Sequence, residues 1–245
     1  MNRFFTSTDC ISGLDVELPR DISYQLAVVL RAKKGDTIIV MDGKGTELEV
    51  KLDQIQSGYC RGIVVEERPG IGEPTINVTL YQALIKSDRF EYVLQKGVEV
   101  GVSRFVPFIS SRTDRSSVSQ NRNKRWHRII KEAAEQSGRC IIPDLTDLKT
   151  YHEALSISNG LTLIPWEKEN KLCLKEALTA QLKRFKEDIK EVSVFVGPVG
   201  GFTVSEINDA IDSGALPVSL GPRILRSETA GIVTIAAVLY EFGEI

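Results

Sequence analysis

The sequence predicts an α/β protein in which a small β-barrel precedes a parallel sheet covered by helices. Short apolar strands separated by turn signals fill the N-terminal part, whereas strands alternate with helices from Thr75 onward. Between the two patterns, Arg68–Pro74 is dense in proline and glycine, which is typical of a linker. We therefore expect two domains, residues 1–72 and residues 73–245.

Four apolar stretches predict the strands of the barrel. They are Gln25–Leu30, Thr37–Val40, Glu47–Leu52 and Cys60–Val65. Turn signals such as Lys34-Gly35-Asp36 and Ser57-Gly58 separate them at the spacing of a small barrel.

In the second domain, alternating strands and helices predict a parallel sheet with helices on its faces. The predicted strands are Ile76–Ala83, Phe105–Ile109, Leu161–Pro165, Val192–Val196 and Leu216–Leu220. The predicted helices are Ser87–Val100, Asn121–Ser137, Tyr151–Ser158, Lys171–Lys190, one opened by the capping box Thr203-x-x-Glu206, and Glu228–Phe242. The last helix is apolar on almost every side and therefore needs burial on every side. Either a central position in the core or a subunit interface would provide this burial. We favour the interface, with Ile235 as one of its residues.

Two of these strands run into glycine-proline loops, Gly197–Phe202 and Gly221–Leu225, and each loop leads into a helix. Ligands of α/β proteins bind at this carboxyl edge of the sheet, and glycine lets them approach the bare backbone. The chain has neither G-x-x-x-x-G-K-[ST] nor G-x-G-x-x-G, and the loops are apolar. A flat, partly apolar ligand therefore fits the crevice better than a phosphate.

Composition narrows the class of protein further. The chain is 42% apolar and 26% charged, with no run long enough to span a membrane and no apolar signal-peptide core, so we expect a cytoplasmic protein. Four scattered cysteines without C-x-x-C, and only two histidines, argue against a metal site and give no disulfide framework.

Charge is unevenly distributed although the net charge is only −2. The segment from Arg112 to Lys131 contains a single acid, Asp114. Its basic residues are Arg112, Arg115, Arg122, Lys124, Arg125, Arg128 and Lys131. A solvated helix face is the ordinary explanation of such a run, but its single sign in a balanced chain favours a surface for a polyanion.

One segment carries a specific family resemblance. Leu220–Ala230, with the sequence LGPRILRSETA, resembles the L-G-x-R-I-L-R-x-E-T-A signature of the bacterial 16S rRNA uracil-N3 methyltransferases, the RsmE family of the trefoil-knotted SPOUT superfamily. Gly197–Phe202, Gln95–Gly101, Glu132–Arg139 and the opening Arg3-Phe4-Phe5 are also similar to that family. In one departure, Val199 stands where the family usually has glutamate.

The resemblance implies a PUA-like β-barrel that binds RNA, followed by a knotted α/β methyltransferase domain that works as a homodimer without a metal. It implies S-adenosylmethionine as cofactor and N3 of a uridine in the 16S rRNA of the small ribosomal subunit as target. The cofactor-binding residues that it implies are Leu163, Ile164, Pro165, Val196, Gly197, Pro198, Gly200, Gly201, Leu220, Gly221, Ile224, Leu225, Thr229 and Ala230.

Arg226 is the first candidate for catalysis, because its guanidinium could stabilise the developing enolate oxygen of uracil as N3 loses its proton. Arg223 could do the same or hold a phosphate, and Glu228 either orients the arginines or only complements the helix dipole. Lys96 and Glu99, three residues apart on a helix, are interpreted as a surface or fold-holding pair and not as catalytic groups.

The expected RNA-binding residues are Arg3, Arg112, Arg115, Arg122, Lys124, Arg125 and Arg139. A non-catalytic RNA- or nucleotide-binding protein and a knotted methyltransferase acting on tRNA ribose or another base remain as alternatives.

Overall fold

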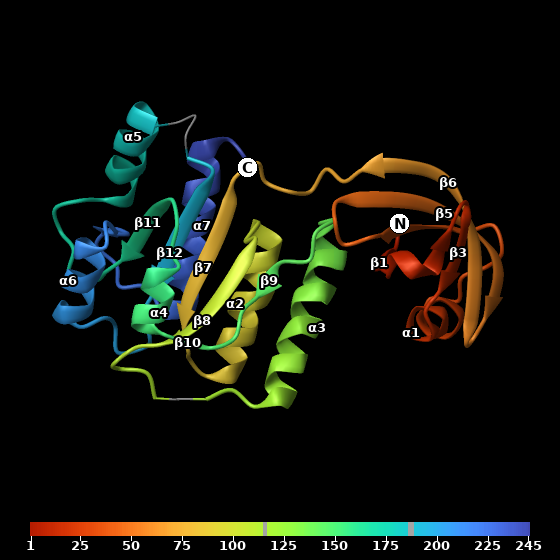
Figure 1. Cartoon of the computed structure of the whole chain (residues 1–245), viewed down its shortest axis with the longest axis horizontal. Coiled ribbons are helices and arrows are strands. Elements are labelled where there is room, and N and C mark those ends of the chain that lie inside the picture. The colour runs from red at the N-terminus through yellow and green to blue at the C-terminus, as the bar shows by residue number, and fades with distance from the viewer. Residues whose placement is uncertain (115–116, 186–188) are drawn as a thin grey trace. The chain divides into compact units, whose positions relative to one another are not determined.

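Two separate sheets organise the chain, each in its own unit (Figure 1). The computed structural model describes residues 1–114, 117–185 and 189–245. The N-terminal unit comprises Met1–Glu73 and Ala134–Ile142, and the C-terminal unit comprises Pro74–Ala133 and Pro143–Ile245.

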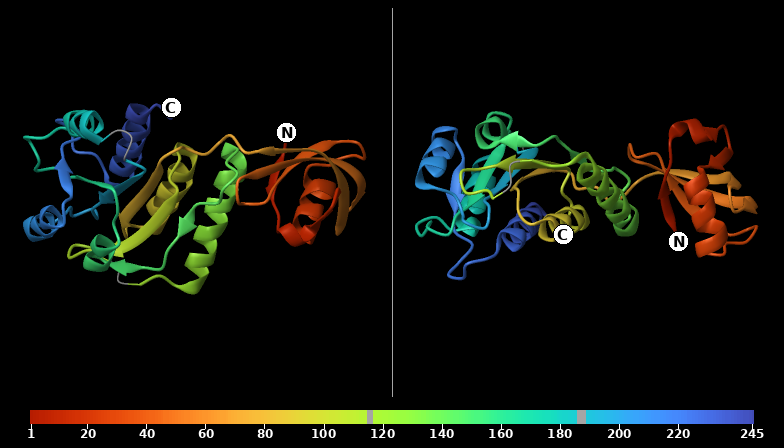
Figure 2. Two further views of the ribbon diagram at one scale, coloured as in Figure 1. Left: turned by 45° about the horizontal axis from the view of Figure 1, so that its top comes forward. Right: turned by 90° about the horizontal axis from the view of Figure 1, so that it is seen from below.

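A curled six-stranded sheet forms the N-terminal unit (Figure 2). Its strands are β1 (Arg3–Phe5), β2 (Ile11–Ser12), β3 (Asp15–Leu18), β4 (Thr37–Met41), β5 (Thr46–Gln56) and β6 (Tyr59–Pro69), in the order β1-β4-β5-β6-β3-β2. β1 runs parallel to β4, and the other neighbours are antiparallel. Apolar side chains such as Val16, Val40 and Val50 are fully buried between the sheet and a short helix. The three predicted strands after residue 36 are confirmed, and β5 and β6 are longer than predicted.

The predicted strand at Gln25–Leu30 is wrong. Instead, α1 (Arg20–Tyr24) continues into a π-helical turn, η2 (Gln25–Val29). Ile22 and Leu26 lie four residues apart and are both buried, so a single helical face supplies the core. The β-branched valines of the stretch favour a strand by propensity, but burial of this face decides the structure.

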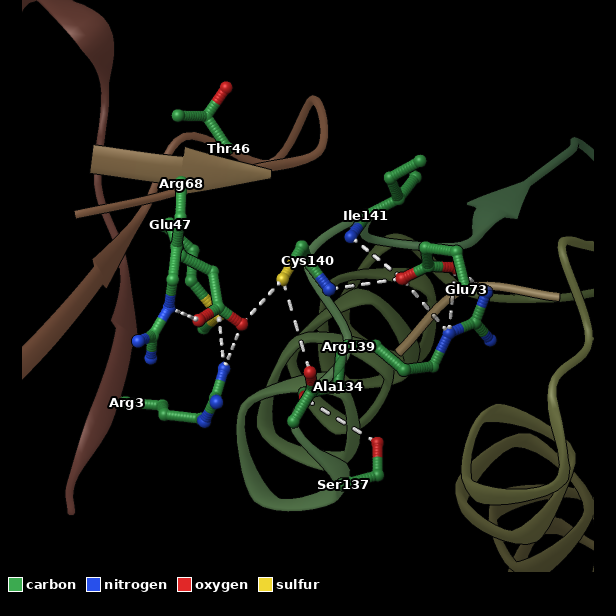
Figure 3. Close-up of polar contacts among 12 residues, drawn as sticks. Arg3, Thr46, Glu47, Arg68, Glu73, Ala134, Ser137, Arg139, Cys140 and Ile141 are labelled. Carbon is green, nitrogen blue, oxygen red and sulfur yellow. Dashed lines mark hydrogen bonds and ion pairs between the residues drawn. The ribbon is translucent and has the colours of Figure 1, made fainter. Parts of the chain in front are cut away.

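A polar cluster fixes Ala134–Ile142 in the N-terminal unit (Figure 3). The Glu73 carboxylate accepts a hydrogen bond from Arg139 Nη2 at 2.6 Å and from the backbone N–H groups of Cys140 and Ile141 at 3.0 Å. Arg139 is only 4% exposed. A buried guanidinium is thereby neutralised at the point where the segment joins the unit.

Glu47 forms a second cluster and is 1% exposed. It accepts hydrogen bonds from Arg3, from Arg68 Nε at 3.3 Å and from the Cys140 thiol at 3.0 Å (Figure 3). Burial acts to raise the pKa of Glu47, but these donors outweigh it and hold that pKa below its usual range. Burial, together with the Glu47 carboxylate, raises the pKa of the Cys140 thiol to about 12. The thiol therefore remains a protonated donor.

The C-terminal unit is built on a parallel sheet of order β10-β8-β7-β12-β11-β13, with β9 beside β8. The strands are β7 (Asn77–Ala83), β8 (Arg104–Ile109), β9 (Asp144–Leu145), β10 (Lys149–Thr150), β11 (Leu161–Pro165), β12 (Glu191–Val196) and β13 (Leu216–Val218). The helices are α2 (Ser87–Val100), α3 (Gln120–Ser137), α4 (Tyr151–Ser156), α5 (Leu174–Phe185), α6 (Val204–Asp212) and α7 (Ser227–Phe242).

Helices cover both faces of this sheet, as the alternating pattern predicts. α2 and α7 pack side by side against one face (Figure 2). On the other face, Tyr81 and Phe195 stack at 4.1 Å between ring centroids, in a core shared with α4 and α6. Burial on two faces explains why consecutive residues of β7 and β12, from Leu80 to Ala83 and from Val192 to Val196, are buried without alternation.

Local signals set most helix ends correctly. α2 stops at Gly101, whose φ is +118°. The predicted capping box of α6 is present, with Thr203 and Glu206 bonded reciprocally. α5 begins later than predicted, at Leu174, and part of its predicted C-terminal end lies outside the described residues.

The last helix is only partly buried. Ile235, Val238 and Leu239 have no exposed surface, whereas Val233 is 42% and Tyr240 69% exposed. The expectation that Ile235 lies on an exposed interface is therefore wrong, because this side chain faces the core of its own unit.

In the described part of the chain, no helix is long and apolar enough to cross a membrane and no group of metal-ligating side chains is found. All four cysteines are unpaired.

Candidate functional site

A cavity of about 700 Å³ opens at the carboxyl edge of β11, β12 and β13. Its walls are the loops that follow these three strands, joined by Arg89 of α2. The predicted residues that line it are Pro165, Val196, Gly197, Pro198, Gly200, Gly201, Leu220, Gly221, Arg223, Ile224, Leu225, Arg226, Glu228 and Ala230. The crevice expected from the glycine-proline loops is thus present.

Three predicted cofactor residues lie elsewhere. Leu163 and Ile164 have no exposed surface and pack inside the sheet, one residue or more before the strand end. Thr229 is exposed on the first turn of α7 but is not part of the cavity wall.

Sequence reasoning missed several lining residues: Arg89, Glu167, Glu169, Asn170, Ser219 and Ser227. Those after β11 could have been found, because they follow a strand that ends at the same edge. Arg89 carries no such signal, since it belongs to a helix remote in sequence.

The first loop is held by hydrogen bonds to its own carbonyl groups. Ser227 Oγ donates to the Gly197 carbonyl at 2.6 Å and accepts from Gln82 Nε2 at 2.9 Å. Gln82 is 1% exposed, so a buried amide fixes the start of α7 against the loop. Within the loop, Gly201 N–H donates to the Pro198 carbonyl at 2.9 Å and closes a turn.

Val199 lies inside this turn and is 67% exposed. The turn closes through backbone groups alone and therefore requires no particular side chain at position 199. Val199 contributes an apolar side chain to the cavity lining.

The second loop presents exposed side chains around a glycine turn. Gly221 has a φ of +97°, a region that strains other residues. Ile224 is 84% exposed at the cavity, and Arg223 and Arg226 are also exposed. Neither arginine forms an ion pair within the described ranges of the chain, so both guanidinium groups are available to a ligand.

Glu228 does not pair with these arginines. Its Oε1 lies 3.5 Å from Arg89 Nε, while its Oε2 is buried without a hydrogen-bond partner among the described atoms. The interpretation in which Glu228 orients Arg223 and Arg226 therefore has no contact to support it.

The expected RNA-binding residues have different environments. Arg112 bonds the Gly200 carbonyl, and Arg125 forms a two-pronged pair with Glu91 at 2.8 and 2.9 Å. Arg122 and Lys124 lie on α3 with no ion pair to any residue that the structure covers. Arg115 lies outside the described residues.

Two further members of that set, Arg3 and Arg139, are engaged with Glu47 and Glu73 in the N-terminal unit. The predicted pairing of Lys96 with Glu99 is confirmed, with Nζ 2.8 Å from both carboxylate oxygens and both side chains half-buried.

Comparison with known proteins identifies the C-terminal part of the chain as an RNA methyltransferase domain. The family model described as an RNA methyltransferase domain matches residues 72–239. The ribosomal RNA small subunit methyltransferase E of Bacillus subtilis is 30% identical over 224 residues, 89% of this chain and 87% of the relative. That of a Synechocystis species is 33% identical over 218 residues, 88% of this chain and 69% of the relative.

A solved structure agrees. The ribosomal RNA small subunit methyltransferase E of Neisseria gonorrhoeae, crystallised bound to S-adenosyl methionine, is 31% identical and superposes with a TM-score of 0.85 over 98% of this chain and 97% of that one. The chain belongs to the ribosomal RNA small subunit methyltransferase E family.

Proposed function

We propose that this protein transfers a methyl group from S-adenosylmethionine to N3 of a uridine in the 16S rRNA of the small ribosomal subunit. The observation that carries the proposal is the cavity formed by three loops at the carboxyl edge of the sheet, with the family signature lining it. The relatives are small-subunit rRNA methyltransferases, which indicates rRNA as the substrate class. The resemblance of Leu220–Ala230 to the signature of the uracil-N3 methyltransferases indicates N3 as the position on the base.

The lining of the cavity fits this cofactor. Apolar side chains such as Trp166, Ile224 and Leu225 suit a flat purine, and bare glycine backbone suits its polar edge. The carboxylates of Glu167 and Glu228 suit the positive charges of a sulfonium and an ammonium group.

When bound, S-adenosylmethionine supplies a methyl group on a sulfonium that needs no further activation. The loops must align the base with that methyl, and such alignment lowers the barrier strongly. Arg226, exposed at the cavity and unpaired among the described residues, stabilises the negative charge that develops on a uracil oxygen as N3 loses its proton. Arg223 serves the same charge or a neighbouring phosphate. The target base must leave its stack to enter.

Within this proposal, residues 1–72 are a PUA-like barrel that binds RNA, and residues 73–245 are a knotted methyltransferase domain. The curled six-stranded sheet supports the first assignment. The strand order supports the second, because β12 lies between β7 and β11 although it follows β11 in the chain. Crosslinking to RNA tests the first, and an experimentally traced backbone tests the second.

The proposal also includes a homodimer. An apolar groove between α5 and α7, of about 360 Å³, is lined by Leu174, Leu178, Val233, Ala237 and Tyr240. Val233→Asp and Tyr240→Asp should give a folded monomer in light scattering, because both side chains are exposed. A wild-type monomer that methylates RNA would contradict the dimer.

The deciding experiment incubates the protein with S-adenosylmethionine and unmodified 16S rRNA, free or in small subunits, and identifies the product nucleoside by mass spectrometry. We expect N3-methyluridine and micromolar binding of the cofactor by calorimetry. A methyl group on a ribose or another base would replace the substrate assignment. Cofactor binding without transfer to either RNA form would favour a non-catalytic binding protein.

A further inference from the structure

Arg112 is an exposed residue whose side chain lies along the first cavity loop, Gly197–Phe202, called the cofactor loop below. Its Nη1 donates a hydrogen bond of 2.8 Å to the Gly200 carbonyl, and its aliphatic carbons run beside the Gly200 Cα. A Cβ built on Gly200 would meet Arg112 Cβ at 3.3 Å and Cδ at 3.4 Å, and its three nearest atoms all belong to Arg112. The arginine therefore covers one side of the loop and bonds its backbone.

The position of Arg112 is itself fixed by a buried carboxylate. Glu206, 6% exposed, accepts from the Ser111 N–H at 2.9 Å through one oxygen. Through the other oxygen it accepts from the Thr203 N–H at 2.7 Å and from the Thr203 hydroxyl at 2.9 Å. One side chain thus joins the residue before Arg112 to the residue that ends the cofactor loop.

We propose that Arg112 is a positioning residue for the cofactor loop, not an RNA contact of the basic run to which it belongs in sequence. Together with the Ser227 bond to the Gly197 carbonyl, it holds the loop at its first residue and at its middle while the backbone faces the ligand. A preorganised loop loses less conformational entropy on binding, and cofactor affinity rises accordingly. This inference rests on the proposed function, because it presumes that the loop binds S-adenosylmethionine.

The same geometry explains the glycine at position 200. Its φ is outside the left-handed region, unlike that of Gly201 at +68°, so its backbone conformation admits alanine. The three atoms nearest to a methyl group there all belong to the Arg112 side chain. The substitution Gly200→Ala should therefore be harmful because of Arg112 and not because of the ligand.

This dependence gives a double-mutant cycle measured by calorimetry with S-adenosylmethionine. We expect Arg112→Ala to raise the cofactor Kd about tenfold, as for loss of a charge-assisted hydrogen bond. Gly200→Ala should raise it by a similar factor in the wild-type background, yet by less than about twofold when Arg112 is already alanine. Arg104→Ala, which removes another exposed and hydrogen-bonded arginine of the same unit, is the matched control and should leave the Kd within about twofold.

Steady-state kinetics separate positioning from RNA contact. For Arg112→Ala we expect the KM for the cofactor to rise and the KM for RNA to stay within about twofold. A raised RNA KM with an unchanged cofactor Kd would overturn the inference and return Arg112 to the RNA surface. An equal effect of Gly200→Ala in both backgrounds would also overturn it, since the ligand would then be what forbids the methyl group. If the wild type binds no S-adenosylmethionine, the proposed function itself fails before the cycle begins.

Discussion

The arginines of the two units differ in what surrounds them. In the N-terminal unit, Arg139 is 4% exposed and bonded to Glu73 (Figure 3). At the cavity of the C-terminal unit, Arg223 and Arg226 are exposed and form no ion pair with any described residue. An arginine bonded to a carboxylate out of water holds the fold, because removing either partner leaves a buried charge. An arginine left in solvent at a cavity adds little to stability and is free to meet a substrate.

The largest effect should follow from breaking the paired arginine. Glu73→Ala removes the 2.6 Å bond to the buried Arg139 guanidinium and the acceptor of two backbone N–H groups, and we expect a loss of about 3–5 kcal/mol in the free energy of unfolding. Denaturant titration measures it. Glu66→Ala, which removes a loose 3.8 Å pair between exposed side chains, is the control and should cost less than about 1 kcal/mol.

The free arginine should show the opposite behaviour. Arg226→Ala should lower single-turnover methylation by about two to three orders of magnitude while the melting temperature and cofactor Kd stay near wild type. Arg226→Lys should recover little, because a point charge does not reproduce the planar guanidinium. If Arg226→Ala instead lowers both the melting temperature and the affinity for the cofactor, Arg226 has a structural role like that of Arg139.

The basic residues between Arg112 and Lys131 should also differ according to whether they are paired. Arg122→Ala and Lys124→Ala should each weaken RNA binding and flatten its salt dependence by about one unit of log–log slope, if each contacts one phosphate. Arg125→Ala should do less to the slope, because its guanidinium is held by Glu91. Fluorescence anisotropy at several salt concentrations distinguishes these cases. If the slope is unchanged in all three variants, these residues form a solvated helix face and do not contact RNA.

The smallest effect concerns pH. Burial acts to raise the pKa of Glu206, but hydrogen bonds from Thr203 and Ser111 outweigh it and lower that pKa below its ordinary value of 4.5. The carboxylate therefore stabilises the fold above pH 4.5, and this contribution is lost as the pH falls through the lower folded value. Glu206→Gln should cost about 1 kcal/mol at neutral pH, and its melting temperature should converge on that of the wild type in acid. A constant difference at every pH would exclude the ionised carboxylate as the cause.

Sequence predicted the elements whose signals are local. Apolar runs between glycine and proline gave β7, β12 and the cavity loops, because strand, turn and helix start follow one another without interruption. The stretch Gln25–Leu30 failed, because its strand propensity competed with a helical face that only the packed core reveals.

Pairing between distant residues was beyond sequence reasoning. Nothing local distinguishes Arg139, which is buried against Glu73, from Arg122, which stays on the helix surface. The contact of Arg112 with Gly200 joins positions 88 residues apart, and Arg89 reaches the cavity from α2. These depend on how the strands are ordered in the sheet, which a single sequence does not reveal.

The Cys140 thiol, buried and bonded to Glu47, has a practical consequence for chemical labelling. The thiolate is the nucleophile that reacts with alkylating reagents, and a pKa of about 12 leaves almost none of it at neutral pH. Cys10 and Cys173 are partly exposed and should be modified first in the native protein. The rate of Cys140 alkylation, followed by mass spectrometry, then reports how often the segment Ala134–Ile142 opens, without any introduced probe.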